Sequence, residues 1–398
     1  MNWDLISLLV FYFIIFIFYH KNKEKFEVQG GIFFLYKTKF GLKLMKKISD
    51  LSPKLLKGLS SIGVIVGFGG MVFIFVFLIK ATLELLFVPG TEPALAPVLP
   101  GISIPGFPAL GFWHWIIALF IAAVIHEFAH GIISKLYHIR IKSSGFAFMG
   151  PILAAFVEPD ENELVKSSKW QQLSVYAAGP FINILLGIFV LLFIGFVFAP
   201  LLSGIYDSNG IVISEVIDGY PVYDSGIELP FVITSINGVE VLDVNDFVDA
   251  TEDLKPDEEV LLGTDKGEYE LILVENPDNV SKGFFGMSGF AQKNEIKEKY
   301  DFYGFDSFIQ WTYLLLIWLF LINIGVGLFN LLPLGPVDGG RMFYTLALWK
   351  FKNEKYAKRA LLWISIFILG LIIINMLPWI TKLLVWILGI FGVLIALF

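Results

Sequence analysis

The chain has 398 residues, of which 56% are hydrophobic and 16% charged, and its mean hydropathy is +0.74. Soluble globular proteins are roughly 25% charged, so this composition excludes a single soluble domain. The absence of cysteine excludes disulfides, thiolate catalysis and cysteine-based metal sites. Residues 203–303 hold 22 acidic and 6 basic residues, a net charge of −16, whereas the remainder holds 14 acidic and 23 basic residues, net +9. We therefore expect an acidic, water-facing domain within a membrane protein that has basic edges.

Seven apolar runs, nearly free of charged residues, are candidate membrane spans, since a bilayer core of roughly 30 Å needs about 20 apolar residues in a helix. The first run is expected to be a retained anchor rather than a signal peptide, because no basic residue precedes it and no small-residue cleavage site follows it. The last two runs are separated only by Leu377-Pro378, and one run wrongly split in two is the alternative interpretation. The seven runs cover residues 5–19, 60–78, 112–133, 173–202, 308–332, 360–377 and 379–398.

The distribution of lysine and arginine predicts how these spans are oriented, because such residues are enriched in cytoplasmic loops. Ten lysines lie between Lys21 and Lys57, which predicts a cytoplasmic loop. Residues 81–134 contain no lysine or arginine, so the loop over 88–111 is expected on the outer side. Alternation then predicts that the N-terminus and the acidic domain are extracytoplasmic and the C-terminus cytoplasmic. No basic stripe lies outside the membrane flanks, so nucleic acid is not an expected partner.

Residues 145–157 form an apolar segment that is too short to cross the bilayer and is interrupted by Gly150 and Pro151. Irregular backbone at membrane depth is tolerated only where it is buried in protein or lines a cavity. We therefore expect a re-entrant segment here. An interfacial loop is the alternative interpretation.

The acidic region changes from helical to alternating periodicity, which predicts a small domain of strands with one helix. The helix is expected to begin after Asp243 as its N-cap, with Asp246 in the first turn, and to run to about Leu254 before Pro256. Strands are expected over residues 211–216, 231–236, 260–262 and 268–274.

The sequence from His126 to His130 has the HExxH pattern and lies within the third span. Residues four apart on a helix differ by about 40° in direction, so the two imidazoles face one side and can share a metal ion. Glu127 points about 100° away from His126, which suits a base beside the metal rather than a ligand on it. Ionisable residues within a span are costly unless they are functional or paired. A polar cluster that joins helices and a transport or proton-relay role are the alternatives to a metal site.

A catalytic zinc ion needs a third protein ligand and keeps a fourth position for water. Asp338 is the favoured candidate, because it follows the fifth span on the same expected membrane side as His130. Two prolines end that span, and two glycines after Asp338 allow a close turn around the carboxylate. A helix-end cap is the alternative role for Asp338. The other candidate ligands are His20, Glu84, Glu92, His114, His138, Glu158 and Asp160.

In combination, these features resemble the site-2 protease family, the intramembrane metalloproteases. Residues 330–341 are similar to the family's N-x-x-P-x-P-x-x-D-G motif, with one departure: Gly335 stands where many members carry proline, and the second proline is displaced to Pro336. The acidic domain is similar to a PDZ module. The resemblance also rests on the HExxH sequence, on residues 179–183 (GPFIN) in the fourth span and on residues 156–160 (FVEPD).

The resemblance implies that His126, His130 and Asp338 bind one zinc ion and that Glu127 is the catalytic acid and base. It also implies that Asn183 lies near the site, where its amide donates to a developing oxyanion. Without the resemblance, an interhelical hydrogen bond is the expected role of Asn183. For the PDZ-like domain it implies a groove that receives an extended peptide by strand addition, with residues 209–211 as candidates for carboxylate-binding amides. A spacer that limits access by size is the alternative.

The sequence therefore predicts a polytopic α-helical membrane protein of about seven spans, with a re-entrant segment and a small extracytoplasmic α+β PDZ-like domain. The membrane domain is expected over residues 1–202 and 301–398, and the PDZ-like domain over 203–300. The expected function is that of an intramembrane zinc endopeptidase, which cleaves transmembrane segments of single-span membrane proteins near the cytoplasmic face. An extended substrate is expected to pair with an unpaired edge of residues 145–157. A transporter or channel, a non-catalytic PDZ scaffold and a prenyl-protein-processing HExxH protease are the alternatives.

Overall fold

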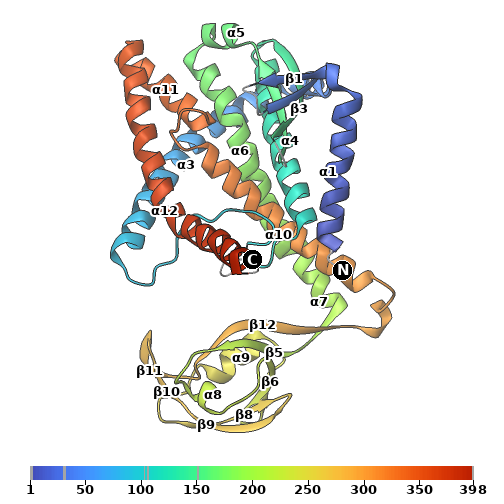
Figure 1. Ribbon diagram of the computed structural model, residues 1–398, viewed down its shortest axis with the longest axis vertical. Coiled ribbons are helices and arrows are strands. Elements are labelled where there is room, and N and C mark those ends of the chain that lie inside the picture. Colours follow the sequence, from blue (N-terminus) through green and yellow to red (C-terminus); the bar gives the residue numbers. More distant parts are fainter. Residues whose placement is uncertain (1–2, 30–32, 103, 105–106, 150–151, 397–398) are drawn as a thin grey trace. The chain divides into compact units, whose positions relative to one another are not determined.

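The computed structural model describes residues 3–29, 33–102, 104, 107–149 and 152–396. The chain divides into two compact units, one formed by Met1–Phe193 with Thr312–Phe398 and the other by Ile194–Trp311. The first unit is largely helical and the second largely β-sheet, as Figure 1 shows. The strands of the second unit lie between Tyr206 and Ile296, and the domain bounds expected from the sequence stay a prediction.

Five helical segments among the described residues are long and apolar enough to cross a membrane. They are α3 (Pro53–Phe87), α4 (Phe112–Leu136), the segment Lys169–Ile205, α10 (Phe305–Asn330) and the part of α12 (Glu354–Ala396) up to Val385. The segment Lys169–Ile205 comprises α6 (Lys169–Phe193), the π-helix η2 (Ile194–Phe198) and α7 (Ala199–Ile205). A shorter apolar helix, α1 (Trp3–Lys21), matches the first expected span. The chain is thus a multi-pass membrane protein, and the count of seven spans stays a prediction.

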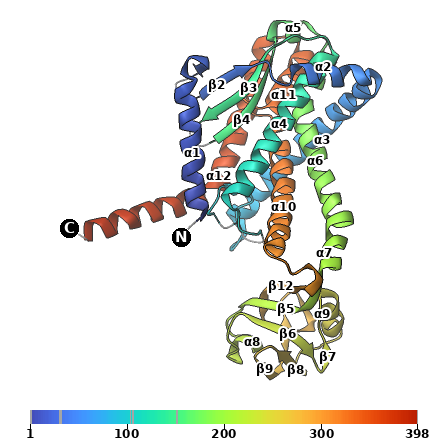
Figure 2. The ribbon, with the colours of Figure 1, turned by 90° about the vertical axis from the view of Figure 1, so that its right-hand side faces the viewer.

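The expected break between the last two spans is absent, because α12 is one helix that contains Pro378 in its interior. Proline removes one backbone hydrogen bond and bends a helix without having to end it. Proline is also tolerated in membrane helices, where neighbouring groups compensate the freed carbonyl. Figure 2 shows that the red C-terminal part of this helix points away from the rest of the first unit.

A four-stranded antiparallel sheet lies beside the helices and has the order β1-β2-β3-β4 (Figure 2). Its strands are β1 (Phe26–Gln29), β2 (Phe33–Thr38), β3 (Ile141–Met149) and β4 (Ile152–Pro159). The segment expected to be re-entrant therefore consists of two paired strands, with Gly150 and Pro151 outside the described residues. A Cβ atom at Gly145 would overlap the carbonyl oxygen of Tyr36, so β2 and β3 approach closely at this position.

The strands β1 and β2 come from the lysine-rich segment between the first two helices, where the sequence was interpreted only as a loop. β2 covers one edge of β3, pairing Phe34 with Phe148, while β4 pairs only with β3 among the described strands. The other edge of β4 is thus free of strand pairing. β4 also packs against α4, the helix that carries the HExxH sequence.

Small residues on α3 allow close packing of the helices behind the site. A Cβ atom at Gly63 would lie 3.0 Å from the ring of Phe181 on α6, and one at Gly67 would lie 2.8 Å from Cε of Met342. Met342 belongs to α11 (Asp338–Phe351), the short helix that begins at the candidate third ligand. These glycines therefore serve helix packing, as small residues do in membrane proteins.

The second unit is built around a six-stranded antiparallel sheet. Its main path is β12-β5-β6-β8-β9, and β7 pairs with β6. Its helix α9 (Val244–Thr251) starts as expected, with Asp243 as N-cap and Asp246 completing a capping box, but ends at Thr251 rather than near Leu254. The strands are β5 (Tyr206–Val216), β6 (Phe231–Ile236), β7 (Val239–Glu240), β8 (Glu259–Thr264), β9 (Gly267–Ile272) and β12 (Met287–Ile296), and β10 (Val274–Asn276) pairs separately with β11 (Asn279–Phe284).

Residues 209–211, the candidates for carboxylate-binding amides, are part of the sheet. They lie in β5, which is an interior strand: Ile211 is paired with Gln292 on β12 and with Ile233 on β6. The backbone N–H of Gly210 also donates to the carbonyl of Leu242 at 3.0 Å. The edge strand on that side of the sheet is β12.

Candidate metal centre

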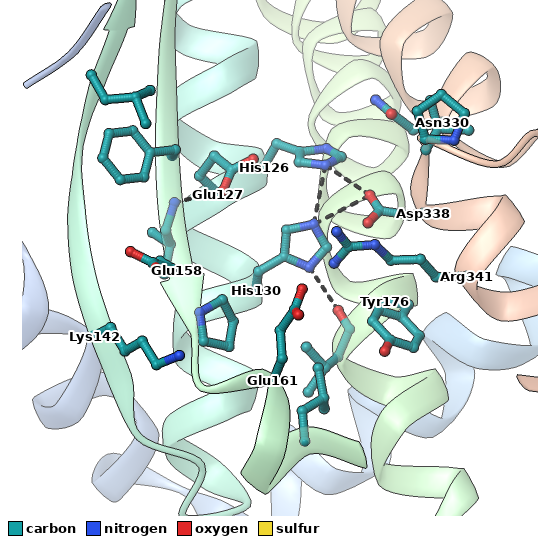
Figure 3. Close-up of a pocket in the computed structure, with 18 of the residues that line it drawn as sticks. His126, Glu127, His130, Lys142, Glu158, Glu161, Tyr176, Asn330, Asp338 and Arg341 are labelled. Carbon is teal, nitrogen blue, oxygen red and sulfur yellow. Dashed lines mark hydrogen bonds and ion pairs between the residues drawn. The ribbon is translucent and has the colours of Figure 1, made fainter. Parts of the chain in front are cut away.

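His126 and His130 project from one face of α4 and are buried, with 7% and 8% of their surfaces exposed. Their Nε2 atoms lie 3.1 Å apart. The four-residue spacing therefore places both imidazoles side by side, as the helical period requires. Figure 3 shows both rings pointing toward the carboxylate of Asp338.

Asp338 reaches the histidines because the chain turns sharply between α10 and α11. α10 ends at Asn330, and α11 begins at Asp338 itself. Cβ atoms at Gly339 and Gly340 would overlap backbone carbonyl groups of residues 331–334, so the turn is too tight for any larger residue. The carboxylate oxygen Oδ2 of Asp338 lies 3.0 Å from Nε2 of His126 and 3.2 Å from Nε2 of His130.

These three atoms form a triangle that fits a zinc ion. Zinc bound tetrahedrally at about 2.0–2.1 Å holds its ligand atoms about 3.3 Å apart, close to the observed 3.0–3.2 Å. Gly179 of α6 faces the same triangle, because a Cβ atom there would lie 2.5 Å from Nε2 of both His126 and His130. Glycine at this position thus leaves the space in front of the ligand atoms open.

Contacts from α6 orient the two imidazoles. Nδ1 of His130 lies 2.7 Å from the carbonyl oxygen of Val175, an acceptor that holds the ring proton on Nδ1 and leaves the Nε2 lone pair for a metal. Nδ1 of His126 lies 3.3 Å from the side-chain nitrogen of Asn183, which is completely buried. The structure therefore places Asn183 next to a candidate ligand, while its role as an oxyanion donor stays a prediction.

Glu127 lies beside the ligand triangle. Glu127, His126 and His130 each offer an atom within 4.8 Å of the others, so Glu127 is a competing candidate for the third ligand. Asp338 is the better one, since its Oδ2 is within 3.2 Å of both Nε2 atoms, whereas Oε2 of Glu127 accepts a 2.8 Å hydrogen bond from the backbone N–H of Val157. Glu127 therefore points toward β4.

A cavity of about 590 Å³ opens at the ligand triangle and extends along β4. Its wall contains four of the five predicted site residues, namely His126, Glu127, His130 and Asp338, and Asn183 is not among the described residues that line it. It also contains further charged side chains, and Arg341, which the sequence did not single out as a site residue, is the one shown closest to Asp338 in Figure 3. Its guanidinium lies 5.8 Å from the ring centroid of Tyr176. The sequence feature that could have identified Arg341 as a site residue is its position three residues after Asp338, because residues three apart on a helix are neighbours. The other charged residues of the wall are Lys37, Lys142, Glu158 and Glu161.

Two alternative ligands have structural partners instead. Asp160 caps α5 (Glu161–Lys166) and binds the guanidinium of Arg140 at 2.7 Å, an interaction that lowers the pKa of Asp160 below its ordinary value. Glu158 accepts a 2.6 Å hydrogen bond from Ser143. Asp160 therefore stabilises the start of α5, and Glu158, in the cavity wall, links β4 to β3.

Comparison with known proteins identifies the family to which this geometry belongs. Residues 114–374 match peptidase family M50. The chain belongs to peptidase family M50. The matched region contains both histidines, Glu127 and Asp338, and members of this family are zinc-dependent metallopeptidases. The chain is also 31% identical over 333 residues to an uncharacterized protein of Methanocaldococcus jannaschii, covering 80% of this chain and 79% of that protein. The resemblance to site-2 proteases inferred from the sequence is thus confirmed at the level of the family.

Proposed function

We propose that this M50 peptidase is an intramembrane zinc endopeptidase that cleaves transmembrane segments of other membrane proteins. The observation that carries the proposal is the triangle of His126, His130 and Asp338 next to Glu127. The two histidines and Glu127 lie within an apolar helix that is long enough to cross a membrane. Buried ionisable groups in such a helix are costly, so their convergence on one point favours catalysis over a structural role.

His126, His130 and Asp338 would hold the zinc ion, which supplies a Lewis acid and lowers the pKa of water. Glu127 then removes a proton from the attacking water and returns it to the leaving amine. Its carboxylate is suited to this step, because it lines the cavity beside the three ligands without belonging to the triangle. The hydrogen bond from Val157 fixes one carboxylate oxygen and leaves the other for water.

The substrate is proposed to bind as an extended strand along β4. A helical substrate hides its peptide bonds in its own hydrogen bonds, so it must unwind before attack. The unpaired edge of β4 offers replacement partners, and residues 156–159 of this strand line the cavity together with Glu127. Strand pairing would thus bring an unwound segment to the ligand triangle.

The orientation proposed from the lysine and arginine distribution puts the active site toward the cytoplasmic face and the second unit outside. Single-span membrane proteins in the surrounding bilayer are the proposed substrates. The second unit is proposed to be PDZ-like and to bind an extended peptide at β12, whose outer edge lies at the end of the sheet order. Cavities of about 260 and 240 Å³ lie near the 5.6 Å ring contact between Phe247 of α9 and Phe290 of β12.

The test is cleavage of a single-span test substrate by the purified full chain, native and with Glu127→Gln. Loss of a general base typically costs about 10²–10⁴-fold in rate, so we expect cleavage to fall by that factor while the zinc content stays unchanged. Glu161→Gln is the matched control, since Glu161 lines the same cavity but does not belong to the group formed by His126, Glu127 and His130. Cleavage by Glu127→Gln at the native rate would refute the proposal.

A further inference from the structure

One face of α6 serves both candidate histidine ligands. Val175, Gly179 and Asn183 follow one another at intervals of four residues, so they lie along the same side of the helix. Val175 offers its carbonyl oxygen to His130, and Gly179 leaves space in front of both Nε2 atoms. Asn183 is the remaining member of this face, and its amide lies against Nδ1 of His126.

Asn183 is fully buried, yet its hydrogen bonds are incomplete. Its side-chain nitrogen lies 3.3 Å from Nδ1 of His126, and its side-chain oxygen has no hydrogen-bond partner among the residues that the structure describes. A buried polar atom without a partner costs free energy, so such an atom calls for an explanation.

Metal binding decides which end of the Asn183 amide faces His126. When Nε2 of His126 binds a metal, the proton of the neutral imidazole is on Nδ1 and needs an acceptor. The two ends of a side-chain amide have nearly the same shape, so a half-turn of the Asn183 amide brings its oxygen next to this N–H. The turn pairs the imidazole N–H with the amide oxygen, and the amide nitrogen then takes the position in which the oxygen had no partner.

We propose that Asn183 is a positioning residue, whose side-chain oxygen accepts a hydrogen bond from Nδ1–H of His126 and fixes the ring with Nε2 toward zinc. This inference rests on the zinc site of the proposed function. Asn183 then does for His126 what the Val175 carbonyl does for His130. Such outer partners of ligating histidines typically contribute 10–100-fold to metal affinity.

The geometry separates this role from that of an oxyanion donor. Nδ1 and Nε2 lie on different edges of the imidazole ring, and Asn183 contacts the edge that does not face Asp338. Asn183 is absent from the described residues that line the 590 Å³ cavity, whereas an oxyanion donor has to reach the substrate there.

Two substitutions distinguish acceptor from donor. Asn183→Leu removes both hydrogen-bonding groups at similar size, while Asn183→Asp keeps an acceptor oxygen and removes the donor. Asn323→Leu is the matched control: Asn323 is also fully buried in a membrane helix with an unpartnered oxygen among the described atoms, and its amide donates to Leu319 of its own helix at 2.7 Å.

The experiment measures zinc affinity of the full-length protein by competition with a chelator, and the visible spectrum of the cobalt-substituted protein as a report on ligand geometry. We expect Asn183→Leu to weaken zinc binding about 10–100-fold and to alter the cobalt spectrum. Asn183→Asp and Asn323→Leu are expected to bind zinc like the native protein.

Native zinc affinity in Asn183→Leu would overturn the inference while leaving the peptidase proposal intact. Loss of zinc affinity in Asn183→Asp equal to that in Asn183→Leu would also overturn it, because an acceptor would then not suffice. If the native protein binds no zinc, the proposed function itself fails. Should Asn183→Leu not fold, the comparison of Asn183→Asp with the native protein still decides: the acceptor role predicts native zinc affinity and a native cobalt spectrum in Asn183→Asp, and weaker zinc binding by this variant would overturn it.

Discussion

The carboxylate oxygen of Asp338 lies 3.0 Å from Nε2 of His126, although 212 positions separate the two residues in the chain. The HExxH helix supplies two ligand atoms on one face, and the turn after α10 supplies the third from a different part of the sequence. A metal ion at this site would therefore require the helices of the first unit to be packed around α4.

Gly179→Ala is expected to abolish zinc binding. The added Cβ atom would lie 2.5 Å from Nε2 of His126 and of His130, which is closer than van der Waals contact allows, so the rings must move out of the ligand geometry. Zinc content of the purified variant is the measurement. Gly69→Ala on α3 is the control, because a Cβ atom there meets nothing within 4 Å, and it should keep native zinc content. Zinc retained by Gly179→Ala would contradict the ligand assignment.

Ala155→Pro tests the pairing of substrate with β4. Because the N–H of Val157 points to Glu127 and not to β3, the alternation of an antiparallel strand directs the N–H of Ala155 to the same free edge. Proline removes this donor, so we expect kcat/KM to fall about fivefold, the value of one hydrogen bond of about 1 kcal/mol, with zinc content unchanged. Ala155→Val, which keeps the N–H, is the control. Equal kcat/KM in the two variants would exclude pairing at this position.

Substrate sequence should matter through helix stability. Glycine in a helix costs about 1 kcal/mol relative to alanine, so one alanine-to-glycine change next to the scissile bond is expected to raise the cleavage rate about fivefold if unwinding precedes the cut. The measurement compares two single-span substrates that differ only in this residue. The same change at the far end of the span is the control. Equal rates for a strongly helical and a weakened substrate would argue against prior unwinding.

The stability of the second unit should depend on its own hydrophobic core. Phe231 is 1% exposed and packs among buried aliphatic residues of the sheet, so Phe231→Ala is expected to destabilise this unit by about 3–5 kcal/mol. Limited proteolysis of the full chain should then cut within residues 194–311. Phe290→Ala is the control, since Phe290 is 50% exposed and its removal leaves no buried cavity. Unchanged protease resistance of Phe231→Ala would show that this core is not essential.

Local patterns predicted those parts of the fold that depend on neighbouring residues. The spacing of His126 and His130 predicted their common face, and Asp243 with Asp246 predicted the start of α9. The extension of α12 through Pro378 was not predicted, because proline was taken as a boundary although a packed membrane helix tolerates it.

The sequence alone did not predict the pairing of strands that lie far apart in the chain. The strands β1 and β2 lie in a lysine-rich segment, and their pairing with β3 brings residues more than one hundred positions apart together. Asn183 was identified only by resemblance, since the partner that gives it a role, Nδ1 of His126, lies on another helix. Arg341 was overlooked because its place in the cavity depends on where Asp338 lies.

The account depends most directly on Asp338 completing a zinc site with the two histidines. The decisive measurement is the zinc content of the purified protein, native and with Asp338→Ala, with Glu127→Gln as the matched carboxylate control. We predict one zinc ion per chain in the native protein and in Glu127→Gln, and loss of zinc in Asp338→Ala, since three protein ligands hold a catalytic zinc ion. Full zinc content in Asp338→Ala would contradict the account.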